Sequence, residues 1–145
     1  MNYLNLPPVW LLGFVAAAWG ISRVTEPGPP LLVWAGAGLV LAALALMGWA
    51  VLAFRRARTT IVPRERPSAL VAAGPYRFSR NPIYLADLAI LAGAALILRA
   101  PVALVLLVPF QQVLLRLFIL PEEAVLEQDL GQPYRDFKAR VRRWL

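Results

Sequence analysis

The chain has 145 residues, of which 60% are hydrophobic, and it carries a formal net charge of +7. This is too apolar for an ordinary soluble protein, and the length suits a single domain. Cysteine and histidine are both missing, which excludes disulfides and thiolate or imidazole metal sites, and we expect no metal. All but one of the 15 basic residues are arginines, and they cluster beside apolar runs. This pattern indicates a membrane surface as the partner and not nucleic acid.

Four apolar segments approach or exceed the roughly 20 residues that a helix needs to cross a membrane. They are residues 3–21, 31–54, 83–98 and 102–120. The first lacks the basic start and the small-residue cleavage site of a signal peptide. The third and fourth are joined by Arg99-Ala100-Pro101, where proline predicts a sharp turn and a helical hairpin. The sequence therefore predicts one all-α integral membrane domain over 1–145, a bundle of about four transmembrane helices with a cytoplasmic amphipathic helix over 121–145.

Arginines are concentrated in the loop between the second and third apolar segments. They are Arg55, Arg56, Arg58, Arg64, Arg66, Arg77 and Arg80. The two other loops hold only Arg23 and Arg99. Because basic loops stay on the cytoplasmic side, we expect this loop and both termini to be cytoplasmic, as in a bacterial inner membrane. Small residues on the second and third segments, Gly36 and Gly93 among them, would let these two helices approach closely.

A polar patch, GPYRFSRNPIYL from Gly74 to Leu85, lies directly before the third segment. Gly74-Pro75 predicts a turn, and Asn81-Pro82 is typical of an N-cap followed by proline at the first helical position. A helix start presents unpaired N–H groups and a partial positive charge, which suits an anionic group such as a carboxylate. The alternative is a plain cap surrounded by interfacial tyrosines and by arginines that reach the lipid headgroups.

A second polar cluster follows the fourth segment. There Pro121 predicts the start of a new helix, with Glu122 and Glu123 in its first turn. The two glutamates could simply complement the helix dipole. Both clusters are expected on the same membrane face, however, so two carboxylates there could also hold a ribose diol, an ammonium or a sulfonium.

The stretches SALVAAGPYRFSRNPIY (68–84) and PEEAVLEQDLGQPYRDFKARVRRW (121–144) together resemble a known superfamily. It comprises the isoprenylcysteine carboxyl methyltransferases and the phospholipid N-methyltransferases, which are integral membrane enzymes. The family pattern is Gly-x-Tyr and Arg-(His or Asn)-Pro-x-Tyr, then a helical hairpin, then Glu-Glu-x-x-Leu, Gly-x-x-Tyr and a basic end. Each motif alone is weak, but both in this order form a specific signal over roughly the C-terminal half.

The resemblance implies S-adenosylmethionine as methyl donor, with S-adenosylhomocysteine as product, and a membrane lipid or lipophilic acceptor at the cytoplasmic face. The family's cofactor contacts fall on Ser68, Ala69, Leu70, Val71, Tyr76, Asn81, Pro82, Ile83, Tyr84 and Glu122. Weaker candidates for contact with the acceptor are Asp87, Glu123 and Arg116. No catalytic residue is assigned, because methyl transfer from a sulfonium needs mainly positioning and the exclusion of water.

One departure from the family bears on the acceptor. Phe118 stands where the eukaryotic carboxyl methyltransferases have an arginine that engages the substrate carboxylate. Arg116 lies roughly 200° away around the helix and cannot replace it. This favours a phospholipid amine, with carboxyl methylation of an isoprenylcysteine as the alternative.

Two interpretations from other classes stay open. Four short spans with one intramembrane carboxylate also describe a small proton-coupled multidrug transporter, in which Asp87 would bind the proton. A scaffold held to anionic lipid by its arginine-rich loop is the third possibility. The transporter leaves the two motifs and the long polar C-terminal helix unexplained.

Overall fold

The computed structural model describes residues 6–57 and 70–145, and this part of the chain is helical without any strand. The α-helices are α1 (Pro7–Ser22), α2 (Leu31–Ala57), α3 (Pro82–Ile97), α4 (Leu107–Leu114), α5 (Leu120–Leu130) and α6 (Gln132–Arg140). Three short helices accompany them: η2 (Gly74–Arg77) and η3 (Pro101–Leu106) are 3₁₀-helical, and η4 (Leu115–Ile119) is π-helical.

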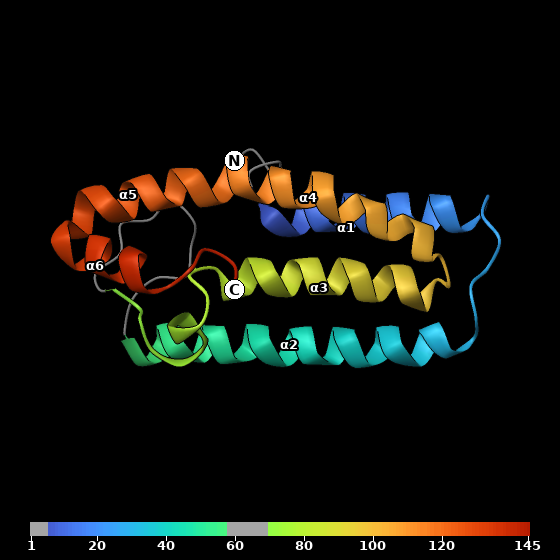
Figure 1. The fold of residues 1–145 in the computed structure, drawn as a ribbon, viewed down its shortest axis with the longest axis horizontal. Helices are drawn as coiled ribbons and strands as arrows, with labels where there is room; N and C mark the ends of the chain where they lie inside the picture. Colours follow the sequence, from blue (N-terminus) through green and yellow to red (C-terminus); the bar gives the residue numbers. More distant parts are fainter. Residues whose placement is uncertain (1–5, 58–69) are drawn as a thin grey trace.

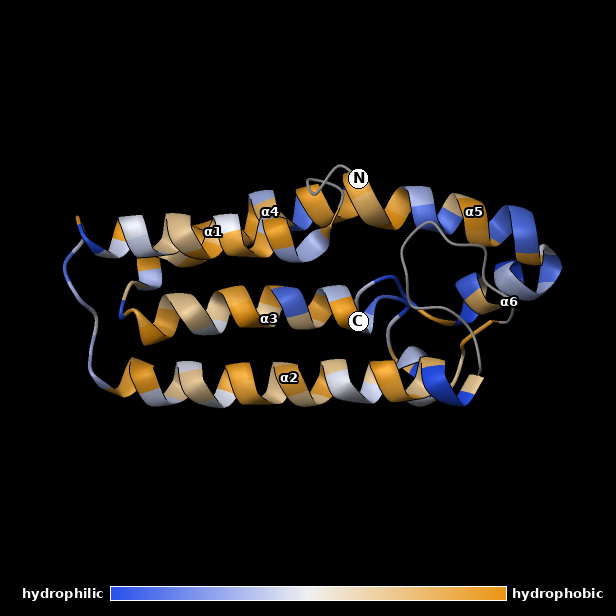
Figure 2. Cartoon of the chain, turned by 180° about the vertical axis from the view of Figure 1, so that it is seen from behind, coloured by the Kyte–Doolittle hydropathy of each residue, from blue (hydrophilic) through white to orange (hydrophobic). Residues whose placement is uncertain are grey.

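Helices α1 to α4 run side by side, and α5 and α6 extend beyond them at one end (Figure 1). We call this end, where α2 finishes and α3 begins, the polar end. Hydropathy follows the same division, because α1 to α4 are mostly apolar whereas α5 and α6 are rich in polar residues (Figure 2). The predicted all-α helix bundle is confirmed.

Within residues 6–57 and 70–145, two helices are long and apolar enough to cross a membrane: α2, with 27 residues, and a continuous helix of 30 residues over Pro101–Leu130. Helices α1 and α3 have 16 residues each. At 1.5 Å per residue this is about 24 Å, less than the roughly 30 Å of a hydrocarbon core. Both are apolar and lie along the longer helices (Figure 1). That these four helices span the membrane stays a prediction.

The boundaries agree closely with the sequence at two helices. The third segment begins at Pro82 as predicted, and the second runs three residues further than expected, to Ala57. This extra turn contains Arg55 and Arg56, whose charges are favourable at a helix C-terminus. Residues 3–5 of the first predicted span lie outside the described residues.

The expectation that Pro121 starts a separate helix over 121–145 is wrong. Ile119 and Leu120 already have helical backbone angles, so the fourth helix continues through Pro121 to Leu130. Proline normally clashes with the carbonyl four residues earlier. The π-helical turn before Pro121, in which the Leu120 N–H donates to the Leu115 carbonyl, widens the helix at this point. The tail is then divided by Gly131, with φ of 60°, into α5 and α6.

Helices α2 and α3 are in backbone contact. A Cβ atom at Gly36 would lie 2.5 Å from the Gly93 carbonyl oxygen, and one at Gly93 would lie 2.9 Å from the Gly36 carbonyl oxygen. Ala43 and Ala50, at spacings of seven residues, are buried on the same side of α2 as Gly36. This seam confirms that small residues bring the second and third helices together.

The predicted turn at Arg99 is also confirmed, and it is tied to the loop between α1 and α2. Arg99 has a φ of 54°. Its Nε donates to the Gly28 carbonyl at 2.7 Å, and the Gly28 N–H donates to the Arg99 carbonyl at 2.7 Å. These reciprocal bonds fasten the two loops at the end of the bundle opposite the polar end.

Candidate active site at the polar end

A hydrogen bond joins the first turns of α3 and α5. The Tyr84 hydroxyl donates to Glu122 Oε1 at 2.7 Å, and the tyrosine is only 7% exposed. Its ring also packs on Phe118, with 6.3 Å between ring centroids. Tyr84 therefore lies against Phe118 and Glu122, which come from consecutive turns of the continuous fourth helix.

The π-helical turn η4 contains Phe118 and ends at Ile119, three residues before Glu122. Such turns add a residue to the helix and occur often at functional sites. Here the turn both accommodates Pro121 and allows the helix to continue past Tyr84 with Phe118 and Glu122 on the side that faces α3. This turn was not predicted from the sequence, although a proline inside an apolar helix is a signal for irregular geometry.

Tyr76, from η2, is the second aromatic residue near Glu122. It is buried and packs edge-on against Phe54 of α2, with 5.4 Å between ring centroids. Burial, together with the nearby charge of Glu122, raises the pKa of Tyr76 well above its ordinary value. The structure thus brings together Tyr76, Tyr84 and Glu122, three of the residues predicted to contact the cofactor.

Glu123 has a different environment from its neighbour Glu122. Arg143 donates to it through two bonds of 2.9 Å, and Arg80 Nη1 lies 3.3 Å from the same carboxylate. The side chains of Arg80 and Glu123 are 9% and 8% exposed. Burial and the charge of Glu123 raise the pKa of Tyr134 on α6 to about 12. Glu123 is therefore an anchor for two arginines, and neither Arg80 nor Arg143 was predicted as a site residue.

Asn81 occupies the predicted N-cap position of α3, but its side chain does not cap the helix. Instead its Nδ2 donates to the Arg143 carbonyl at 3.0 Å. Ser79 Oγ donates to the same carbonyl at 3.3 Å, and the Arg80 N–H donates to the Arg142 carbonyl at 3.0 Å. The first residues before α3 thus bind the C-terminal segment, a pairing that no local pattern indicated.

The other predicted cofactor contacts lie around these groups. Leu70, Val71 and Ile83 belong to an apolar cluster with Tyr76 and with the aromatic residues of α6. Pro82 is the buried first residue of α3. Ser68 and Ala69 lie outside the described residues.

Two of the candidate acceptor contacts differ sharply in exposure. Asp87 is 4% exposed and lies on α3 one turn beyond Tyr84. Arg116 is exposed on the π-helical turn. Asp87 is therefore within reach of the Tyr84 side of the site, whereas Arg116 faces the surroundings of the bundle.

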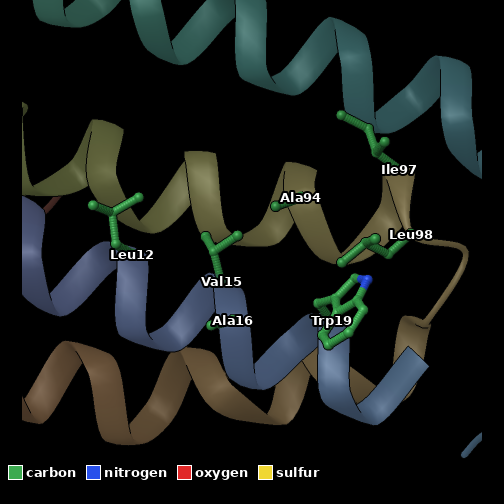
Figure 3. A pocket seen from close by; sticks show the side chains of 7 residues that line it. All are labelled: Leu12, Val15, Ala16, Trp19, Ala94, Ile97 and Leu98. Atoms are coloured by element: carbon green, nitrogen blue, oxygen red, sulfur yellow. The ribbon is translucent and has the colours of Figure 1, made fainter. Parts of the chain in front are cut away.

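A pocket between α1 and α3 lies near the opposite end of the bundle. It is lined by Leu12, Val15, Ala16, Trp19, Ala94, Ile97 and Leu98 (Figure 3). Its walls are aliphatic apart from one indole and offer no carboxylate or basic group. The chemistry that the sequence predicts is therefore gathered at the polar end.

An apolar helix bundle with a tyrosine–carboxylate cluster at one end has the features of a membrane-associated enzyme. The sequence model of the phospholipid methyltransferase family matches residues 31–132. Because the match covers more than half of the chain, the protein belongs to this methyltransferase family. The matched stretch includes Tyr76, Tyr84 and Glu122, whereas Arg143 lies beyond it. The comparisons with curated proteins and with solved structures each found no match.

Proposed function

We propose that the protein is an S-adenosylmethionine-dependent methyltransferase that acts on a lipid or lipophilic molecule at the cytoplasmic face of a membrane. A phospholipid amine is the leading case. The observation that carries this proposal is the Tyr84–Glu122 hydrogen bond, which joins the two halves of the motif inside the family match. The arginine-rich composition near the polar end supports a cytoplasmic orientation for that end.

The residues at the polar end fit the chemistry of S-adenosylmethionine. Its sulfonium suits the faces of aromatic rings, which Tyr76 and Tyr84 supply. Its ribose hydroxyls and amino group suit a carboxylate acceptor, which Glu122 supplies. Its own carboxylate suits the start of α3, where backbone N–H groups lack helical partners. When bound, this cofactor would supply an electrophilic methyl group.

The contribution of the chain is mainly to position the reactants and exclude water. The aromatic rings of Tyr76, Tyr84 and Phe118 are all buried, and the hydroxyl of Tyr84 binds Glu122. A low dielectric strengthens each polar contact made there. Asp87, one turn deeper on α3, offers a second carboxylate toward an acceptor that approaches from the lipid.

Phe118 supports an amine as the acceptor. It is 2% exposed and packs on Tyr84, at the position where the carboxyl methyltransferases have the arginine that holds the substrate carboxylate. An unpaired carboxylate in such apolar surroundings would cost several kcal/mol. An amine headgroup has the opposite requirement, which the carboxylate of Asp87 meets. Family membership favours this proposal over the transporter, which would need Asp87 but not the Tyr84–Glu122 pair.

The cofactor assignment is tested by the binding of S-adenosylhomocysteine to the purified protein in detergent, measured by calorimetry. Glu122→Gln should weaken binding about tenfold, because a charged acceptor is lost while the shape is kept. Glu127→Gln is the matched control, since Glu127 lies on the same helix but pairs with Lys138 and Arg135 at the surface. Equal affinity of Glu122→Gln and the wild type would refute this role of Glu122.

The acceptor assignment needs a second experiment. The wild-type protein is incubated with radiolabelled S-adenosylmethionine and either phosphatidylethanolamine or a farnesylcysteine analogue. We expect label in phosphatidylethanolamine. Efficient labelling of the farnesylcysteine analogue, with phosphatidylethanolamine inert, would show that Phe118 does not exclude a carboxylate substrate.

A further inference from the structure

The last five residues of the chain, Val141–Leu145, follow α6 without forming a helix, yet they are fixed at several points. The Arg80 N–H, Ser79 Oγ and Asn81 Nδ2 bind the carbonyls of Arg142 and Arg143. The guanidinium of Arg143 is bound by Glu123 on α5, and these hydrogen bonds raise its pKa above the usual value. The segment therefore bridges the start of α3 and the start of α5, and the chain ends beside α3 (Figure 1).

This anchoring determines where Trp144 lies. The indole is half-buried and packs against the apolar cluster that contains Tyr84, Phe118 and Leu114. Its neighbour Arg143 is bound to Glu123, which directly follows the Glu122 that Tyr84 contacts. Trp144 is thus an aromatic residue from the far end of the sequence, placed beside the candidate site by bonds that do not involve its own ring.

The position suits contact with a lipid. Tryptophan is enriched at the boundary between hydrocarbon and headgroups, because its ring is apolar and its N–H is polar. Trp144 packs on the apolar cluster of the bundle and directly follows Arg142 and Arg143 of the C-terminal segment. The part of the indole that remains exposed is a surface that an acceptor approaching from the lipid would meet near Tyr84.

From this arrangement we propose that Trp144 forms a wall of the acceptor site and determines how tightly the lipid acceptor binds. The Arg143–Glu123 pair is the positioning device that holds it there. The proposal rests on the methyltransferase function proposed above, and it assigns cofactor binding to Tyr84 and Glu122 and acceptor binding to Trp144. The Kd of the cofactor product and the KM of the lipid therefore report on the two roles separately.

The test compares Trp144→Ala with the wild type in mixed micelles in which the mole fraction of phosphatidylethanolamine is varied. We expect the KM for the lipid to rise about tenfold, since much of the ring contact is lost, with kcat within about threefold. The Kd of S-adenosylhomocysteine, measured by calorimetry, should stay within about twofold. Trp34→Ala is the matched control. Trp34 is 77% exposed and lies near the start of α2, away from the polar end, so the lipid KM of this variant should be unchanged.

Two further variants keep the proposal falsifiable. Arg143→Gln should raise the lipid KM in the same direction as Trp144→Ala, because the Arg143–Glu123 pair, the side-chain anchor of the segment, is lost. Trp144→Phe keeps an aromatic ring, so it decides the matter if the alanine variant does not fold, and we expect a KM increase of about threefold with normal cofactor affinity.

The outcomes also separate this inference from the proposed function. An active wild type whose lipid KM is unaffected by Trp144→Ala and Trp144→Phe would overturn the role of Trp144 alone. If the affinity for S-adenosylhomocysteine falls while the lipid KM rises, the role of Trp144 in acceptor binding is overturned too, since Trp144 would then support the whole site. A wild type that binds no S-adenosylhomocysteine would overturn the proposed function and this inference together.

Discussion

Helix α3 takes part in two regions that are built on different physical grounds. Toward its C-terminus, Gly93 meets Gly36 of α2 in a seam of backbone contacts without any charged group. At its N-terminus, Tyr84 and the residues before the helix meet carboxylates and arginines of α5 and the C-terminal segment. The seam depends on the absence of side-chain volume, whereas the polar end depends on paired charge. Added side-chain volume should therefore be destabilising in the seam, whereas the loss of a charged side chain should be destabilising at the polar end.

The polar end itself contains two adjacent glutamates with different partners. Glu123 is bound by Arg80 and Arg143, whereas Glu122 accepts the Tyr84 hydroxyl. One carboxylate holds the fold at this point, and the other belongs to the candidate site. This contrast can be tested directly, because the two side chains are chemically identical.

The largest effect is expected from Glu123→Ala. It leaves two guanidinium groups without their carboxylate, one of them on the buried side chain of Arg80, and breaking a buried pair costs about 3–5 kcal/mol of unfolding free energy. Thermal unfolding in detergent should show a large drop in the midpoint. The control is Glu127→Ala, whose ion pairs are exposed and contribute at most about 1 kcal/mol. Equal midpoints for the two variants would contradict the anchoring role of Glu123.

The seam predicts the next largest effect. Gly36→Ala would place a methyl group 2.5 Å from the Gly93 carbonyl and 2.8 Å from the Ile97 nitrogen, so the two backbones must separate. We expect a loss of about 1–3 kcal/mol, as for other overpacked sites. Gly38→Ala is a matched control on the same helix, because its Cβ would meet nothing within 4 Å. It should be neutral or stabilising by about 0.5–1 kcal/mol. A stable Gly36→Ala variant would show that the helices can move apart at little cost.

The regions also differ in how well the sequence predicts them. The seam follows from local composition, because glycine and alanine on apolar helices indicate close packing. The start of α3 at Pro82 and the turn at Arg99 follow from the conformational limits of proline. These features depend on a few neighbouring residues, so the sequence alone predicts each of them.

At the polar end the sequence predicts the participants but not all their partners. Tyr76, Tyr84 and Glu122 were identified through the family resemblance, and the structure places them together. The bond from Asn81 to Arg143 spans 62 residues, and local capping rules cannot indicate it. The path of the helix through Pro121 was mispredicted because proline normally favours a helix start, and only the π-helical turn permits continuation. The contacts that the sequence missed are those between segments distant along the chain.

The smallest expected effect concerns Asp87, which lies on α3 between the two regions. Asp87→Asn keeps the shape of a side chain that is 4% exposed and removes only its charge. If Asp87 faces an amine acceptor, kcat/KM for phosphatidylethanolamine should fall about tenfold, or about 1.4 kcal/mol, because one favourable charge interaction is lost. The Kd of S-adenosylhomocysteine should stay within about twofold, since Tyr84 and Glu122 are intact. Asp129→Asn, at an exposed position of α5, serves as the control and should leave both quantities unchanged. Full methylation by Asp87→Asn would place Asp87 with the seam, as a residue of the bundle that takes no part in binding the acceptor.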